Sequence, residues 1–210
     1  MSRFAGRVLT TAGEELDRHA NRADCLSPDE KRRALAFKYR RDCRAFQARR
    51  VFLRETLGRE LGVPPAEVEL TTSTSGKPAV RTLNGPVWFS QSALTDYTVI
   101  AINREGDVGV DIESAAREFD HLAIARRWFT QNEFCRIDAA ASTGDARLVF
   151  LQCWTAREAV AKLTGEGMAS AIDRYELLVH PLRVVRRDNN RTTPVDVTAD
   201  PPYVMAIVWS

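Results

Sequence analysis

The chain has 210 residues, of which 44% are hydrophobic and 28% charged, and its formal net charge is +2. This is the composition of an ordinary globular protein, and it excludes a disordered chain. No segment is apolar for long enough to span a membrane, and the N-terminal M-S-R-F-A-G-R lacks the apolar core of a signal peptide, so we expect a cytoplasmic protein. Four cysteines without a C-x-x-C pair, and only three histidines, favour reduced structural thiols over a zinc site or a disulfide framework.

Basic residues are concentrated in one part of the chain. Between Lys31 and Arg59 there are eleven Lys or Arg residues and only two acidic ones, Asp42 and Glu55. Arginine supplies most of this charge, and its planar guanidinium suits the binding of phosphate groups. An anionic partner would explain the stretch, and so would a solvated basic face or a GC-rich coding bias.

Two helices are predicted in the first half. S-P-D-E at 27–30 combines an N-cap serine, a proline at the first helical position and a glutamate placed to close a capping box, so a helix begins there. A second helical pattern covers about 42–58, and Gly58 is placed to end it. The segment G-V-P-P at 62–65 then breaks the chain, and S-G-K-P at 75–78 predicts a turn. Short strands are predicted at 67–71, 86–90 and 97–103.

The second half repeats this order of elements without repeating the sequence. We expect a strand to 113, a helix at about 117–128, a short helix capped by Thr130 to about 138, a loop at 141–144 and a long helix at about 145–163. The alternating tail predicts a final antiparallel sheet. The expected fold is α+β with two similar halves, 1–105 and 106–210, related by pseudo-twofold symmetry, each a small antiparallel sheet packed with helices.

Two acidic residues stand close together in V-G-V-D-I-E at 108–113. Apolar residues alternate there with Gly109, Asp111 and Glu113, so both carboxylates point to the same face of a strand. An exposed edge strand is one explanation of this pair. The other is a cation that offsets the repulsion between the two charges, and oxygen ligands without nearby His or Cys favour a hard ion such as Mg²⁺.

A third acidic candidate lies in W-T-A-R-E-A-V-A-K at 154–162. On a helix, Trp154, Glu158 and Lys162 fall on one stripe of the surface. Taken alone, Glu158 and Lys162 would be an ordinary surface ion pair, and Thr155 with Glu158 would also fit a capping box.

The two segments together resemble the signature of the 4'-phosphopantetheinyl transferases, in the two-domain type that activates peptide and polyketide synthases. That family carries G-(V/I)-D and, further along the chain, (F/W)-(S/T/C)-x-K-E-x-x-x-K. Both blocks are present here, and Arg157 in place of the first lysine is the only departure in the second. The resemblance covers about 27–208. Further similar segments are S-G-K-P at 75–78, the arginine-rich helix at 44–54, R-W-F-T-Q-N-E-F at 127–134, G-E-G-M at 165–168 and Y-V-M-A at 203–206.

One motif of the family is altered. The family carries F-N-x-S-H-S ahead of G-(V/I)-D, and the matching F-S-Q-S-A-L at 89–94 has Ala93 where the histidine belongs. In the family that histidine helps to hold the 3'-phosphate of coenzyme A. The surplus arginines of the second helix are candidates to compensate for its loss.

The resemblance implies a reaction. The 4'-phosphopantetheine arm of coenzyme A is transferred to a serine of an apo acyl or peptidyl carrier protein, and adenosine 3',5'-bisphosphate is released. Asp111, Glu113 and Glu158 would be the Mg²⁺ ligands, Glu158 the base for the serine, and Lys162 a cation for the phosphate oxygens. The candidates for binding coenzyme A are Lys31, Arg33, Arg44, Arg50, Lys77, Ser92 and Lys162.

Carrier proteins of this kind are small acidic helical bundles, so a basic rim with an apolar patch at about 122–134 is expected to receive them, unless that patch is plain core. A monomer is expected, because the site lies between the chain's own halves, and no nucleic acid or membrane is expected as a partner. Two other hypotheses remain. Ala93 and Arg157 favour a catalytically impaired homologue that binds coenzyme A or a carrier without transfer, and the basic stretch at 31–59 would suit a nucleic-acid-binding module.

Overall fold

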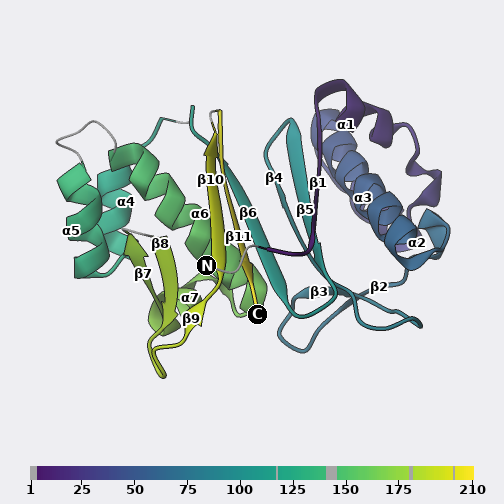
Figure 1. The fold of residues 1–210 in the computed structure, drawn as a ribbon. Coiled ribbons are helices and arrows are strands. Elements are labelled where there is room, and N and C mark those ends of the chain that lie inside the picture. Colours follow the sequence, from purple (N-terminus) through teal and green to yellow (C-terminus); the bar gives the residue numbers. More distant parts are fainter. Residues whose placement is uncertain (1–3, 117, 141–145, 180–181, 201) are drawn as a thin grey trace.

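The computed structural model describes residues 4–116, 118–140, 146–179, 182–200 and 202–210. The fold is α+β, and each half pairs a three-stranded antiparallel sheet with one long helix (Figure 1). The elements of the first half are β1 (Arg7–Ala12), α1 (Gly13–Ala20), η1 (Ala23–Cys25), α2 (Pro28–Leu35), α3 (Arg40–Leu61), η2 (Pro65–Glu67), β2 (Leu70–Thr72), β3 (Pro78–Val80), β4 (Trp88–Ala93) and β5 (Tyr97–Asn103).

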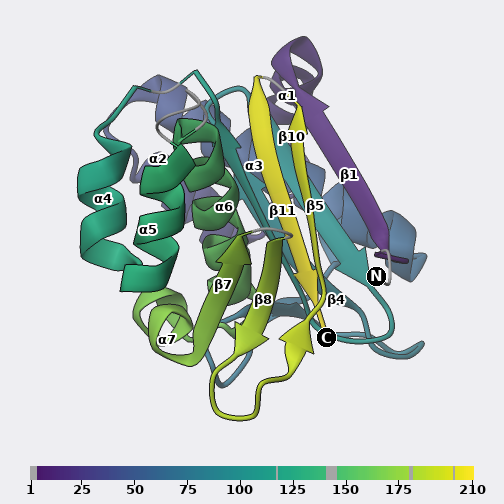
Figure 2. The same cartoon turned by 60° about the vertical axis from the view of Figure 1, so that its left-hand side comes forward.

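The second half begins with the strand that carries the acidic pair. Its elements are β6 (Val108–Ser114), α4 (His121–Trp128), α5 (Gln131–Ala139), α6 (Ala146–Thr164), α7 (Gly167–Arg174), β7 (Tyr175–Val179), β8 (Leu182–Arg186), β9 (Thr192–Thr193), β10 (Val195–Asp200) and β11 (Tyr203–Trp209). Figure 2 shows α4 and α5 packed beside α6. No helix among the described residues combines the length and apolar character needed to cross a membrane.

The two main sheets form the middle of the molecule. One has the strand order β1-β5-β4 and the other β10-β11-β6 (Figure 1). Apolar residues of β5, β6 and β11 pack between them in one cluster, which includes Val99, Val110 and Ile207. Helix α3 covers the outer face of the first sheet through Leu53 and its neighbours, and α6 covers the outer face of the second. The protein is therefore layered as helix, sheet, sheet, helix, and the site described below lies where the layers meet.

Most of the predicted elements are present. Helix α2 has the capping box predicted at Ser27 and Glu30, and α5 has a capping box at Thr130. Strand β5 and helix α6 match the predicted ranges within a residue, whereas of the strand predicted at 67–71 only residues 70 and 71 are in a strand, the start of β2. The loop predicted at 141–144 lies outside the described residues, as does residue 117 at the start of the predicted helix.

Three expectations were wrong or incomplete. Gly58 does not end the second helix, which continues to a left-handed C-cap at Gly62. Gly58 instead allows close approach of the following turn, because a Cβ there would lie 2.8 Å from the Val63 carbonyl oxygen. The tail forms two sheets instead of one, since β7, β8 and β9 pair with each other while β10 and β11 join β6. Strands β1 and β3 and helices α1 and α7 were not predicted.

A glycine on β6 sets the distance between that strand and α6. A Cβ at Gly109 would overlap the backbone carbonyl oxygen of Ala159 and approach the Leu163 nitrogen to 2.6 Å. Backbone atoms in the middle of a helix have little room to move away. Only glycine therefore allows α6 to lie this close to the strand.

We predict that Gly109→Ala lowers the free energy of unfolding by about 3 kcal/mol, since it overpacks a buried contact with backbone. Urea unfolding would measure the loss. Gly13→Ala is the control, because Gly13 has a φ of 52° and nothing within 4 Å of an added Cβ, so only backbone strain of about 1–2 kcal/mol is expected. Equal losses in the two variants would contradict a special role for the Gly109 contact.

Candidate active site

The two faces of β6 have different neighbours. Val108, Val110 and Ile112 pack into the cluster between the sheets. Gly109 lies against α6, and side chains two residues apart share a face, so Asp111 and Glu113 also point to the α6 side. The strand predicted from the alternating sequence is confirmed, and both acids belong to its helix-facing side.

Asp111 is the centre of the polar contacts on this face. It is 6% exposed, and its Oδ1 accepts hydrogen bonds from Ser92 Oγ at 2.8 Å and from Lys162 Nζ at 2.7 Å. Its Oδ2 is buried and has no hydrogen-bond partner among the described residues. A buried carboxylate oxygen without a donor is costly, so Asp111 has the capacity to bind one more cation or donor.

Glu158, on helix α6, lies near Asp111. Burial raises the pKa of Glu158, the negative charges of Asp111 and Glu113 raise it further, and Lys162 opposes them. The charges of Asp111 and Glu113 thus lie near enough to Glu158 to disfavour its ionised form. Lys162 forms an ion pair with Asp111, in place of the surface pair with Glu158 that helical spacing alone would suggest. The capping box at Thr155 is absent, because Thr155 lies within α6 and donates to the Leu151 carbonyl oxygen.

The donor set suits a hard divalent cation. It consists of carboxylate oxygens only, the acids repel one another, and one oxygen of Asp111 lacks a partner. Within the described part of the chain, however, no group of three His, Cys, Asp or Glu side chains is arranged closely enough to hold a metal ion. The Lys162 ammonium supplies the positive charge at Asp111 in this arrangement. The magnesium ligands therefore stay a prediction, supported by the chemistry of the donors.

A cavity of about 390 Å³ adjoins Glu158 and is lined from both halves of the chain. Helix α6 contributes Glu158 and Lys162 to its wall. Arg50 of α3 is the predicted coenzyme-binding arginine that lines it. Its other lining residues are Leu53, Gly76, Lys77, Pro78, Phe89, Ser90, Gln91, Ala161, Gly165, Gly167 and Met168. A ligand in this cavity would touch Glu158, two lysines and an arginine together.

Lys77 lines the cavity, but all three hydrogen-bond donors of its ammonium group already have acceptors. Its Nζ donates to Asp107 Oδ1 at 2.7 Å and to the carbonyl oxygens of Val108 at 2.9 Å and Leu163 at 3.1 Å. An ammonium has three donors, and all of them are used. Burial lowers the pKa of Lys77, and Asp107 opposes that effect. Lys77 thus joins the turn before β3 to β6 and to the end of α6, in place of the phosphate contact expected from the sequence.

The other predicted coenzyme ligands are more scattered. Lys31 is exposed and donates to the Asp24 carbonyl oxygen, and Arg33 lies over the ring of Phe46. These two and Arg44 are not among the residues that line the cavity beside Glu158. Ser92 is buried and bound to Asp111, so it contacts the acids directly.

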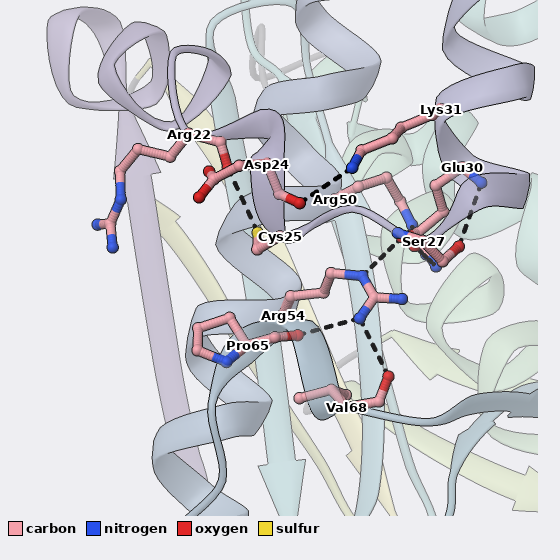
Figure 3. Close-up of polar contacts among 10 residues, drawn as sticks. All are labelled: Arg22, Asp24, Cys25, Ser27, Glu30, Lys31, Arg50, Arg54, Pro65 and Val68. Atoms are coloured by element: carbon pink, nitrogen blue, oxygen red, sulfur yellow. Dashed lines mark hydrogen bonds and ion pairs between the residues drawn. The ribbon is translucent and has the colours of Figure 1, made fainter.

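Arg50 is held by a buried carboxylate. Glu30 of α2 accepts from Arg50 Nε at 2.7 Å through Oε1 and from Arg54 Nε at 2.6 Å through Oε2 (Figure 3). Arg54 also donates to the carbonyl oxygens of Pro65 and Val68, so it is committed to the fold. Burial raises the pKa of Glu30, but the Ser27 amide and the two arginines outweigh it, and the pKa lies below its usual range.

We predict that Glu30→Gln destabilises the protein by about 3 kcal/mol at neutral pH, because two arginines lose their buried counter-charge. A carboxyl with a lowered pKa in the folded state stabilises the fold above the pKa of the unfolded chain, about 4.3, and this stabilisation is lost as the pH falls through the folded pKa. The difference from wild type in urea unfolding should therefore shrink below about pH 4.

Asp29→Asn is the matched control, since the neighbouring Asp29 has an 81% exposed side chain and should change stability by less than about 1 kcal/mol. A difference between wild type and Glu30→Gln that does not change with pH would contradict the assignment.

Arg157, the departure from the family pattern, faces away from the acids. It is 1% exposed and donates to Glu133 Oε1 at 2.6 Å, under the ring of Phe129. Glu133 also accepts from the Leu177 amide, so the pair joins α5, α6 and β7. The change from lysine to arginine at this position thus falls in a buried ion pair and not in the cavity.

The predicted docking patch at 122–134 is partly core. Phe129 is buried, whereas Trp128 is 37% exposed. Ile124 lines a small cavity of about 120 Å³ beside Glu113, together with Phe119, Phe150, Leu151 and Trp154. An apolar cavity in the second half therefore adjoins Glu113.

Comparison with known proteins agrees with this geometry. A family model described as the 4'-phosphopantetheinyl transferase superfamily matches residues 107–208, and one described as the N-terminal part of a 4'-phosphopantetheinyl transferase matches 15–105. The 4'-phosphopantetheinyl transferase HetI of Nostoc is 30% identical over 161 residues, which are 76% of this chain and 67% of that protein. The chain belongs to the 4'-phosphopantetheinyl transferase superfamily.

Other members of the superfamily are also similar. The 4'-phosphopantetheinyl transferase psf-1 of Bacillus pumilus is 29% identical over 87% of this chain and 78% of its own length. The L-aminoadipate-semialdehyde dehydrogenase-phosphopantetheinyl transferase of rat is 32% identical over 75% of this chain. The match spans 54% of the rat protein and 61% of a Synechocystis relative, so parts of these relatives have no counterpart in the match.

Proposed function

We propose that the protein transfers the 4'-phosphopantetheine group of coenzyme A to a serine of an apo acyl or peptidyl carrier protein, in a Mg²⁺-dependent reaction that releases adenosine 3',5'-bisphosphate. The observation that carries this proposal is that Glu158 and Lys162 line a cavity formed by both halves, while Lys162 also pairs with the buried Asp111. Membership of the superfamily supports the same reaction class.

The reaction needs a proton acceptor for the serine. The serine oxygen attacks the phosphorus next to the pantetheine arm, the bond from that phosphorus to the bridging oxygen breaks, and the serine proton passes to a base. Glu158 is the group we assign to this role, because its raised pKa makes it a better proton acceptor than an exposed carboxylate. It lines the cavity directly.

Negative charge develops on the leaving phosphate and must be balanced. Asp111, Glu113 and Glu158 would hold Mg²⁺, which supplies Lewis-acid stabilisation of the pyrophosphate when bound. Lys162 has an exposed fraction of 31% and one of its donors on Asp111, which leaves two donors for phosphate oxygens. Arg50, fixed by Glu30, adds a second cation at the opposite wall.

The surface beside Glu113 supports a carrier protein as the partner. We assign the carrier to the second half near Trp128 and the apolar cavity at Ile124, where the exposed Arg126 and Arg127 would attract its negative charge. We further propose that residues 1–105 and 106–210 are the two halves of a monomeric enzyme, because one chain supplies both walls of the cavity.

An impaired homologue is the second candidate, and Ala93 is the observation in its favour, since the histidine of the family motif is missing. Arg157 no longer supports it, because that residue lies in a buried ion pair. The intact acids and Lys162 favour the active enzyme.

Intact-protein mass spectrometry tests the reaction. With coenzyme A, Mg²⁺ and an apo carrier protein, we expect the carrier to gain the mass of one phosphopantetheine. Asp111→Asn and Glu158→Gln should each slow transfer by about a hundredfold or more, because a ligand or a base is lost.

Glu14→Gln, an exposed carboxylate on α1, should leave the rate unchanged. No mass gain over a panel of acyl and peptidyl carriers would favour the impaired homologue, and full activity of either acid variant would refute its assigned role.

A further inference from the structure

The two faces of β4 separate the acids from α3. Ser90 Oγ accepts from the Val110 amide and Ser92 Oγ donates to Asp111, so these two side chains face β6. Gln91 donates to the Arg49 carbonyl oxygen and Phe89 packs with Leu53, so these face α3. Because side chains alternate, position 93 also faces α3. A histidine at that position would point toward the helix that carries the arginines.

Arg49 lies on this side of β4. Its Nη2 donates to the Leu94 carbonyl oxygen at 2.8 Å, next to Ala93 in the chain. Arg49 and Ala93 line one cavity of about 660 Å³, and the acidic residues Asp96 and Glu113 line other parts of its wall. The small side chain of Ala93 thus leaves room beside a guanidinium that α3 supplies.

Arg49 differs from neighbouring arginines in its ion pairing. Other arginines of this region do pair with carboxylates, Arg50 and Arg54 with Glu30 and Arg59 with Glu55. Arg49 forms no ion pair among the described residues, and its Nε is buried without a partner. Burial lowers the pKa of Arg49, yet a guanidinium stays charged at neutral pH. A partly buried cation with a spare donor and an adjoining cavity is suited to an anion.

We propose that Arg49 binds the 3'-phosphate of coenzyme A and replaces the histidine that the resemblance places at position 93. The inference rests on the proposed function for its ligand, and it adds a binding residue that the sequence motifs do not identify. The guanidinium has the fork of donors that phosphate oxygens accept, and its position is fixed by the carbonyl oxygen of Leu94, the residue after Ala93.

Calorimetric titration with coenzyme A and with 3'-dephospho-coenzyme A tests this assignment without any transfer. The wild-type protein should bind coenzyme A more tightly than the dephosphorylated nucleotide. Arg49→Ala should weaken coenzyme A binding by about tenfold or more, since a charge-assisted contact is lost, and leave the dephosphorylated nucleotide nearly unchanged. Arg49→Gln retains a donor for Leu94 and should show the same selective loss if the charge matters.

A double variant and a control complete the test. Adding Ala93→His to Arg49→Ala should restore part of the preference for the 3'-phosphate, whereas Arg59→Ala, a more exposed arginine of the same helix, should change neither titration. Unchanged binding in both Arg49 variants, or equal weakening for both nucleotides, would overturn the inference while leaving the proposed function intact. A wild-type protein that binds neither nucleotide would refute the proposed function itself.

Discussion

The close packing of α6 on β6 is the constraint on which the site depends. Gly109 lets the helix backbone lie against the strand. Asp111 and Glu113 lie on the same face of the strand as Gly109 and therefore also face the helix. Glu158 and Lys162 are one helical turn apart and reach Asp111 from that helix. A larger residue at position 109 would move Glu158 and Lys162 away from the acidic pair, so a backbone contact controls the charge arrangement.

The junction between the halves is polar at its edges and apolar inside. Valines of β5 and β6 fill the space between the sheets, while Ser92 and Lys77 connect the first half to Asp111 and to the end of α6. Buried polar groups of this kind require matched partners, which favours one relative placement of the halves. The cavity wall formed by both halves is thereby fixed before any ligand binds.

The sequence predicted much of this arrangement because its signals are local. Period-two alternation placed Asp111 and Glu113 on one face, helical spacing placed Glu158 and Lys162 on one stripe, and capping boxes located α2 and α5. Tertiary contacts were not accessible in this way. The commitment of Lys77 to backbone carbonyls, the burial of Arg157 against Glu133 and the contact of Arg49 with Leu94 join distant segments, and no local pattern distinguishes such residues from other basic ones.

The central claim is that Asp111, Glu113 and Glu158 bind one divalent cation. Titration of the protein with Mn²⁺ in the presence of coenzyme A, followed by electron paramagnetic resonance, measures this directly, because Mn²⁺ accepts the same oxygen ligands as Mg²⁺. We predict one bound ion per chain in the wild type, with affinity reduced about tenfold or more in Asp111→Asn, as expected when a charged ligand is lost. Absence of binding in the wild type, or equal binding in Asp111→Asn, would contradict the account.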